Sequence, residues 1–106
     1  MELKTVGFDL IGEQDRKDFE KIFGEYSRKI ERKLKNISSF ILYLKDYSKE
    51  GKRNRYSLHL RAISPAGKTF EASAIDWDFK RTLHKIFTKM ENLLEKEFHL
   101  SDQHQK

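Results

Sequence analysis

Residues 56–94 read YSLHLRAISPAGKTFEASAIDWDFKRTLHKIFTKMENLL, and this stretch decides the fold. In its first part apolar and polar residues alternate one by one, which is typical of strands with one buried face. Two such runs, 56–62 and 70–74, flank a turn at 64–67 in which Pro65 fixes one backbone angle and Gly67 permits a positive one. The sequence therefore predicts two consecutive strands joined by a short turn.

The second part of the stretch changes to helical spacing. Its apolar residues are Phe79, Leu83, Ile86, Phe87, Met90, Leu94 and Phe98. Asp76 or Asp78 caps the start of this helix, since a short carboxylate satisfies free amide groups there and suits the positive end of the helix dipole. We expect a long amphipathic helix over 79–98, and the pattern leaves open which aspartate is the cap.

Three further elements are expected upstream. Val6, Phe8 and Leu10 alternate with Gly7 and Asp9 and predict a strand that ends at Gly12. Residues 15–35 predict an amphipathic helix, and its apolar side chains are Phe19, Ile22, Phe23, Tyr26, Ile30 and Leu34. Residues 40–45 predict a strand that ends in a charged loop at 46–54.

The predicted order of elements is β-α-β-β-β-α, an α+β fold. Because each strand has one strongly apolar face, we expect a four-stranded sheet with both helices packed on one side. The opposite face should meet solvent, and the residues assigned to it are Thr5, Asp9, Lys45, Ser57, His59, Arg61 and Glu71.

Length and composition indicate a single domain. The chain has 106 residues, which suffices for one hydrophobic core over 1–100, with a flexible polar tail at 101–106. Cysteine is absent, so disulfides, thiolate zinc sites and thiol catalysis are excluded. No apolar run has the length of a signal peptide or a membrane span, and we expect a cytoplasmic protein.

The 22 lysines and arginines exceed the 17 acids, and their placement is more informative than the net charge of +5. Opposite the apolar stripe of the 15–35 helix lie Lys17, Lys21, Arg28, Arg32 and Lys35. Opposite the stripe of the 79–98 helix lie Arg81, Lys85, Lys96 and His99, with Lys89 close by. The 46–54 loop and its end add Lys49, Lys52, Arg53 and Arg55.

Cations gathered on two neighbouring helices neutralise phosphates and release counterions, which favours salt-dependent binding of structured RNA. Charged outer helix faces also occur for solubility alone, often as acid–base pairs four residues apart. Both interpretations stay open at this point, and the coincidence of basic crests on both helices favours RNA.

The segment Tyr56–Arg61, the turn at Gly67, the run Phe70-Glu71-Ala72-Ser73-Ala74 and the acid before a basic helix together resemble one family. This is the ribosome hibernation-promoting and ribosome-associated inhibitor family, also called sigma-54 modulation proteins. The likeness covers residues 1–99 and is clearest over 56–94. The spacing of Asp76-Trp77-Asp78-Phe79 departs from the family pattern of one acid before an aromatic residue. In length the chain resembles the short form of the family.

The resemblance implies a β-α-β-β-β-α domain that binds the small ribosomal subunit in the channel for messenger and transfer RNA and silences idle ribosomes. It implies ribosomal RNA contacts by Lys80, Arg81, Lys85 and Lys89 on the second helix, joined by Arg28, Arg32 and Lys35 on the first. The basic pattern adds Lys21, Lys52, Arg53 and Arg55 to the candidate RNA-binding residues.

No catalytic or metal-binding pattern is apparent. The histidines His59, His84, His99 and His104 form no ligand pair at helical spacing. Ser57 and Ser73 lie in no nucleophile turn, and capping explains Asp76 and Asp78 better than acid–base chemistry does. We therefore expect a protein without enzymatic activity, metal, cofactor or small-molecule substrate.

Two alternatives to the ribosome remain. A double-stranded RNA-binding module acting off the ribosome shares the α-β-β-β-α core and also uses helix cations. A protein-interaction subunit would instead meet another polypeptide through its helices or a sheet edge. Trp77 could be a lid over the end of the core or an exposed platform for a base, and we favour the lid.

Overall fold

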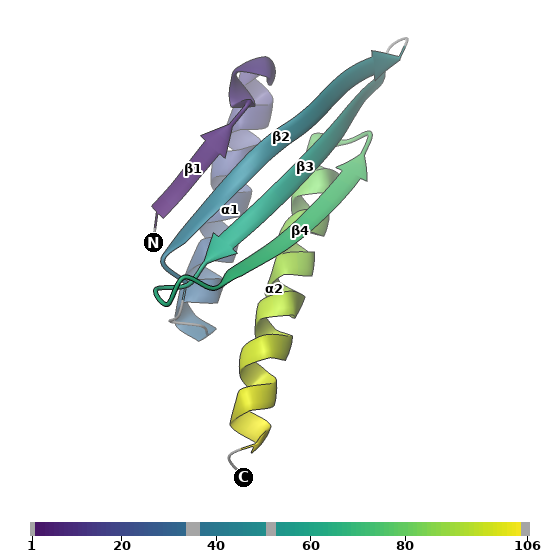
Figure 1. Ribbon diagram of the computed structural model, residues 1–106. Coiled ribbons are helices and arrows are strands. Elements are labelled where there is room, and N and C mark those ends of the chain that lie inside the picture. The colour runs from purple at the N-terminus through teal and green to yellow at the C-terminus, as the bar shows by residue number, and fades with distance from the viewer. Residues whose placement is uncertain (1, 34–36, 51–52, 105–106) are drawn as a thin grey trace.

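The computed structural model describes residues 2–33, 37–50 and 53–104. Its elements are β1 (Glu2–Val6), a 3-10 turn η1 (Phe8–Leu10), α1 (Glu13–Lys33), β2 (Ser39–Glu50), β3 (Arg53–Ile63), β4 (Thr69–Asp76) and α2 (Phe79–His104) (Figure 1). The predicted order β-α-β-β-β-α and the α+β class are confirmed. Neither α1 nor α2, over the described residues, is apolar enough to cross a bilayer.

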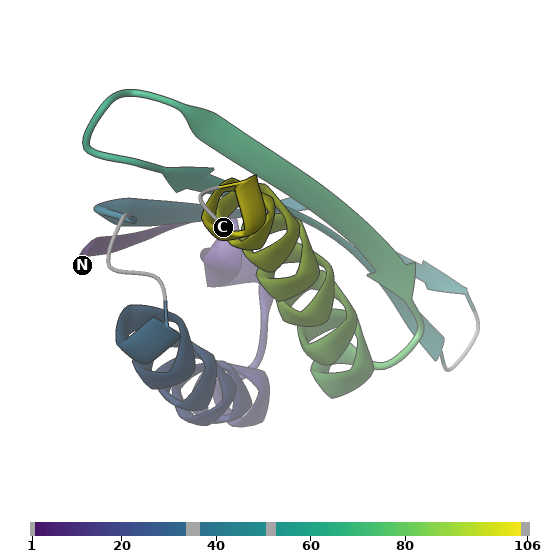
Figure 2. The same cartoon turned by 90° about the horizontal axis from the view of Figure 1, so that it is seen from below.

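The four strands form one mixed sheet in the order β1-β2-β3-β4. β1 runs parallel to β2, and the other two pairings are antiparallel. Both helices cover the same face of this sheet, as expected, and form a single layer beneath it (Figure 2). A parallel pair needs a crossover connection, and α1 supplies it between β1 and β2.

The first strand lies earlier than predicted. β1 ends at Val6, because Gly7 takes a positive φ of 83° and turns the chain into η1. Phe8 is therefore not a strand residue, and its ring packs edge-on against Phe19 with centroids 5.1 Å apart. Thr5 and Asp9 are exposed, as expected, but their assignment to the open face of the sheet was wrong, because Thr5 aligns with the inward-facing Leu42 and Asp9 belongs to η1.

The prediction of a charged loop at 46–54 was wrong as well. β2 continues to Glu50 and β3 begins at Arg53, so most of that segment is paired strand. Pairing with β4 ends at Tyr56 and pairing with β1 ends at Tyr43. The far end of the β2–β3 hairpin is therefore a two-stranded ribbon that projects beyond its neighbours (Figure 1), and with no helix-covered face it lacks the apolar alternation that identifies a strand.

α1 starts earlier and α2 ends later than the patterns indicated. α1 spans Glu13–Lys33 rather than 15–35, and Leu34 and Lys35 lie outside the described residues. α2 starts at Phe79 as predicted and runs to His104, so it includes Ser101–His104, which the sequence assigned to a polar tail. The side chains of 98–104 lie outside what the structure describes.

The core is built from the inward side chains of the strands and the apolar stripes of the helices. Leu42, Leu58 and Leu60 from the sheet have no exposed surface. From α2, Leu83, Ile86, Met90 and Leu94 are equally inaccessible. Full burial of each such side chain stabilises the folded state by about 1.5–3 kcal/mol. The packing of the apolar stripes against the sheet therefore orients both helices. The alternating burial of β4 confirms that its other face meets solvent.

We predict that Gly7→Ala destabilises the fold, because an added Cβ would lie 2.9 Å from the Leu44 carbonyl oxygen at a strained φ. A positive φ in a non-glycine residue costs on the order of 1–3 kcal/mol, so the free energy of unfolding in urea should fall by at least that amount. Gly24→Ala is the control, since its Cβ meets open space in α1 and should stabilise by about 0.5–1 kcal/mol. Equal stabilities of the two variants would contradict this account of the β1 terminus.

Candidate nucleic-acid interface

The outer face of α1 carries the predicted cations that the structure describes. Lys17, Lys21 and Arg28 are exposed on the side of α1 opposite its buried stripe. Arg28 Nε donates to the Gly24 carbonyl at 3.1 Å, which holds the side chain along the helix and leaves its other donors outward. Lys35 lies outside the described residues, as does the side chain of Arg32.

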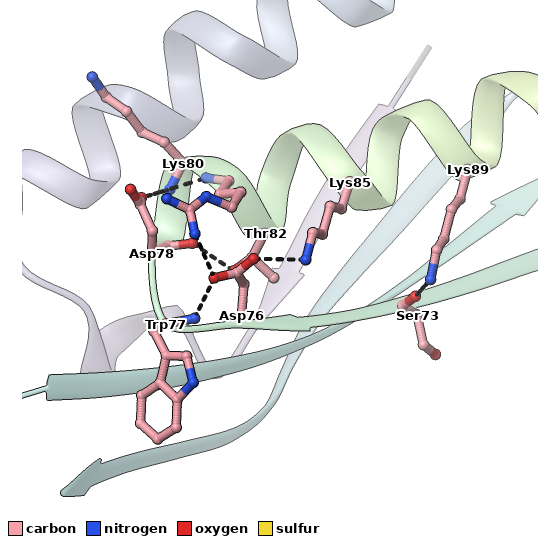
Figure 3. Close-up of polar contacts among 9 residues, drawn as sticks. Ser73, Asp76, Trp77, Asp78, Lys80, Thr82, Lys85 and Lys89 are labelled. Carbon is pink, nitrogen blue, oxygen red and sulfur yellow. Dashed lines mark hydrogen bonds and ion pairs between the residues drawn. The ribbon is translucent and has the colours of Figure 1, made fainter.

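A second row of cations follows α2 along the edge strand β4. Arg81, Lys85 and Lys89 occur at four-residue intervals, so they lie above one another on one helix face. Arg81 Nη1 lies 3.4 Å and Lys85 Nζ 2.7 Å from the carboxylate of Asp76, and Lys89 Nζ donates to the Ser73 carbonyl at 2.8 Å (Figure 3). The row is thus fixed to β4 while its side chains remain exposed.

Asp76 holds two cations of this row in place, Arg81 and Lys85. Its side chain is only 7% exposed, and it also accepts a hydrogen bond of 2.6 Å from the Trp77 amide. Lys85 above all, helped by the Trp77 amide and Arg81, lowers the pKa of Asp76 below its usual value despite burial. The carboxylate therefore stays ionised and orders two neighbouring cations.

Asp78, rather than Asp76, caps α2. Its Oδ1 accepts hydrogen bonds from the Lys80 amide at 2.9 Å and the Arg81 amide at 3.4 Å, as an N-cap side chain does.

Lys80 points away from the other three α2 cations towards α1, where its Nζ lies 4.0 Å from Asp18. Trp77 is 36% exposed and lies outside the buried core, which argues against the lid interpretation.

The cations of the former loop do not join the helix rows. Arg55 lies in β3 opposite Ser48, within the projecting ribbon, and is half-buried. Lys52 and the side chain of Arg53 lie outside the described residues. Among the described candidates, the structure therefore brings together Arg81, Lys85 and Lys89, and sets Lys21 and Arg28 on the neighbouring helix.

Sequence reasoning missed the groove between the helices. α1 and α2 run parallel, since the pairs Asp18–Lys80, Tyr26–Thr88 and Lys29–Glu91 are each separated by the same 62 residues. Tyr26 Oη lies 3.1 Å from Thr88 Oγ1, and Lys29 Nζ lies 3.3 Å from Glu91 Oε2. The four-residue spacing of Glu25 and Lys29 is visible in the sequence, but the partner helix and its offset are not.

The solvent face of the sheet holds a polar network. His59 lies 2.8 Å from both Ser73 Oγ and Glu71 Oε1, and Arg61 binds the same carboxylate oxygen. Hydrogen bonds from His59 and then Arg61 lower the pKa of Glu71. These are cross-strand neighbours on an open surface, where such pairs stabilise a sheet. The described residues contain no group of three suited to a metal ion.

The pKa of Asp15, near the start of α1, is shifted the other way. Burial raises it, and the Tyr56 hydroxyl, which donates to Oδ2 at 3.1 Å, opposes the shift. This contact joins α1 to β3 beside the buried ring of Phe79. Asp15 thus belongs to the packing at one end of the helix layer.

Several solved structures share this fold, among them the following two. A ribosomal subunit interface protein from Coxiella burnetii superposes with a TM-score of 0.67 and 18% identity, over 93% of this chain and 99% of that one. The N-terminal domain of Protein Y from Thermus thermophilus gives a TM-score of 0.53 and 18% identity, over 91% and 98%. No protein-family model and no curated protein matches the sequence.

We predict that Lys85→Met raises the pKa of Asp76 towards its usual value, because Lys85 is the main cause of its low pKa. In the native chain the depressed pKa stabilises the fold at neutral pH, and that contribution is lost as the pH falls through the folded-state pKa. Carboxyl-carbon NMR titration measures the shift. Lys96→Met removes an exposed cation from the same helix and should leave Asp76 unchanged; an unchanged Asp76 pKa in Lys85→Met would refute the assignment.

Proposed function

We propose that this protein binds ribosomal RNA of the small subunit through the outward cations of α1 and α2 and thereby silences translation without chemistry of its own. The observation that carries the proposal is the pair of cation rows on adjacent parallel helices, Lys21 and Arg28 on α1 and Arg81, Lys85 and Lys89 on α2. With such a partner, we expect a cytoplasmic protein.

The shared fold supports a ribosomal partner. One of the two superposed structures is described as a ribosomal subunit interface protein, and nearly the whole of each chain takes part in the superposition. The likeness is in fold, whereas the functional argument depends on the residues of this chain. The sequence resemblance described above points to the same partner.

The electrostatics of the helix layer also support the proposal. Acids near the far end of α2 are matched within the chain, since Glu91 lies beside Lys29 and Glu97 pairs with Lys68. Arg81 and Lys85 keep 64% and 49% of their side-chain surface exposed although they contact Asp76. Because an arginine carries five donors and a lysine three, both retain groups for phosphate oxygens.

A domain bound to RNA in this way acts by occupying the site that other ligands need. Bound in the channel used by messenger and transfer RNA, it excludes both ligands, and its release restores the ribosome. Ordered cations reduce the entropy lost on binding, and Asp76 and the Ser73 carbonyl provide that order here. The interaction should weaken steeply with salt, because counterion release drives it.

We predict that the purified protein sediments with small ribosomal subunits at low salt and that Arg28→Gln/Lys89→Gln weakens this binding. In the described structure these two side chains donate hydrogen bonds to backbone carbonyls, so their loss should leave the fold intact. The slope of log affinity against log salt should decrease by about 1 for each phosphate contact removed. Translation in a purified system should recover in parallel.

Lys4→Gln/Lys45→Gln is the matched control, because it removes two exposed cations from β1 and β2, outside the helix layer. It should bind like the native chain. Equal losses in both double variants would contradict the helix interface. Equally tight binding to a plain RNA duplex would favour an off-ribosome module, and a complex that resists salt and nuclease would favour a protein partner.

A further inference from the structure

The groove between α1 and α2 contains two adjoining hollows. One has a volume of about 240 Å³ and is lined by Glu25, Tyr26, Lys29 and His84. The other, of about 200 Å³, is lined by Asp18, Lys21, Ile22, Glu25, Lys80 and His84. They share Glu25 and His84, and each is smaller than the roughly 300–1,000 Å³ of a drug-sized site. The volumes therefore suit a compact ligand rather than a drug-sized one.

The larger hollow has aromatic walls on both helices. Tyr26 of α1 and His84 of α2 lie with ring centroids 6.0 Å apart, and the buried Phe87 ring stacks against Tyr26 at 5.3 Å and 22°. The Tyr26 hydroxyl is fixed by Thr88. Tyr26 is thus held firmly from the core side, while His84 is exposed and its ring is tilted by 60° to that of Tyr26. A planar base can stack on one of these rings and meet the edge of the other.

The polar groups of this hollow have a defined chemistry. Glu25 and Lys29 stand four residues apart on one face of α1 and offer a carboxylate acceptor beside an ammonium donor. Next to them, Glu91 Oε2 is shielded from solvent and accepts no hydrogen bond from the described part of the chain, although Lys29 Nζ lies 3.3 Å away. Lys29 Nζ also lies 5.9 Å from the Tyr26 ring centroid. At this position the ammonium fills part of the hollow that a ligand could occupy.

We propose that this groove binds a guanine base, presented by an unpaired nucleotide of the RNA that α1 and α2 contact. The carboxylate of Glu25 accepts hydrogen bonds from guanine N1–H and the N2 amino group, and Lys29 donates to O6. The base stacks on one of the rings of Tyr26 and His84 and meets the edge of the other, and Lys21 and Lys80 of the adjoining hollow reach the phosphate. When Lys29 turns to the base, Glu91 remains within reach of the same ammonium.

The chemistry selects guanine among the four bases. A carboxylate pairs with two adjacent donors, which guanine alone presents on its Watson–Crick edge. Adenine would direct the lone pair of N1 at Glu25, and cytosine that of N3. Uracil has a single N–H between two carbonyl oxygens. Inosine keeps the N1–H and lacks the N2 amino group, so its affinity should be intermediate.

This inference deepens the proposed function and rests on it for the source of the base, while the guanine chemistry can be tested without ribosomes. The probe is a fluorescein-labelled short oligouridine with one central guanine, compared with versions that carry adenine or inosine there. Fluorescence anisotropy at low salt measures the dissociation constants. Guanosine monophosphate as a competitor distinguishes a free nucleotide from a base within RNA.

The guanine oligonucleotide should bind about tenfold more tightly than the adenine one, a difference within the range of a bidentate contact. Glu25→Gln should abolish this preference and leave binding of the adenine oligonucleotide within twofold of the native value. Glu20→Gln is the matched control, because Glu20 is an exposed acid of α1 outside both hollows. His84→Ala should weaken binding of every oligonucleotide.

Equal affinity for guanine and adenine, or a preference that survives in Glu25→Gln, overturns the proposal even if the protein still sediments with small subunits. A guanine preference without ribosome binding keeps the groove assignment and overturns the ribosomal function instead. Displacement by guanosine monophosphate as strong as by the oligonucleotide supports the groove chemistry and identifies the free nucleotide as its source.

Discussion

The sheet has one apolar face, and both helices must bury their apolar stripes against it. This constraint determines the rest of the molecule. Because β1 and β2 are parallel, α1 has to cross over the sheet, and α2 then packs beside α1 in the same direction. Each helix is left with its charged side outward, so the cation rows follow from burial of the opposite face.

The same packing creates the groove and its polar contents. Parallel helices with a constant offset of 62 residues place Asp18 near Lys80, Tyr26 near Thr88 and Lys29 near Glu91. Asp76 then connects this layer to the sheet edge, since it ends β4 and holds Arg81 and Lys85. The exposed basic surface thus results from a few fixed contacts beneath its cations rather than from net charge alone.

The sequence predicted the elements whose signal is a buried face. β3, β4 and the start of α2 were placed well because Leu58, Leu60, Ala72 and Leu83 alternate or recur with a clear period. β1 was misplaced because the buried Phe8 suggested a strand, whereas Gly7 ends it. The projecting ribbon and the helix offset could not be predicted from the sequence. Residues 46–54 show no apolar alternation, and the offset depends on contacts between segments far apart in the chain.

The central claim is that the helix layer, and not the open face of the sheet, lies against ribosomal RNA. The chain has no cysteine, so a single one can carry an iron chelate that cleaves nearby RNA with hydroxyl radicals. Asn92→Cys places it on the exposed side of α2, and Ile75→Cys on the solvent face of β4. We expect strong, localised cleavage of small-subunit RNA from position 92 and weak cleavage from position 75; stronger cleavage from position 75, or none from either, would contradict the account.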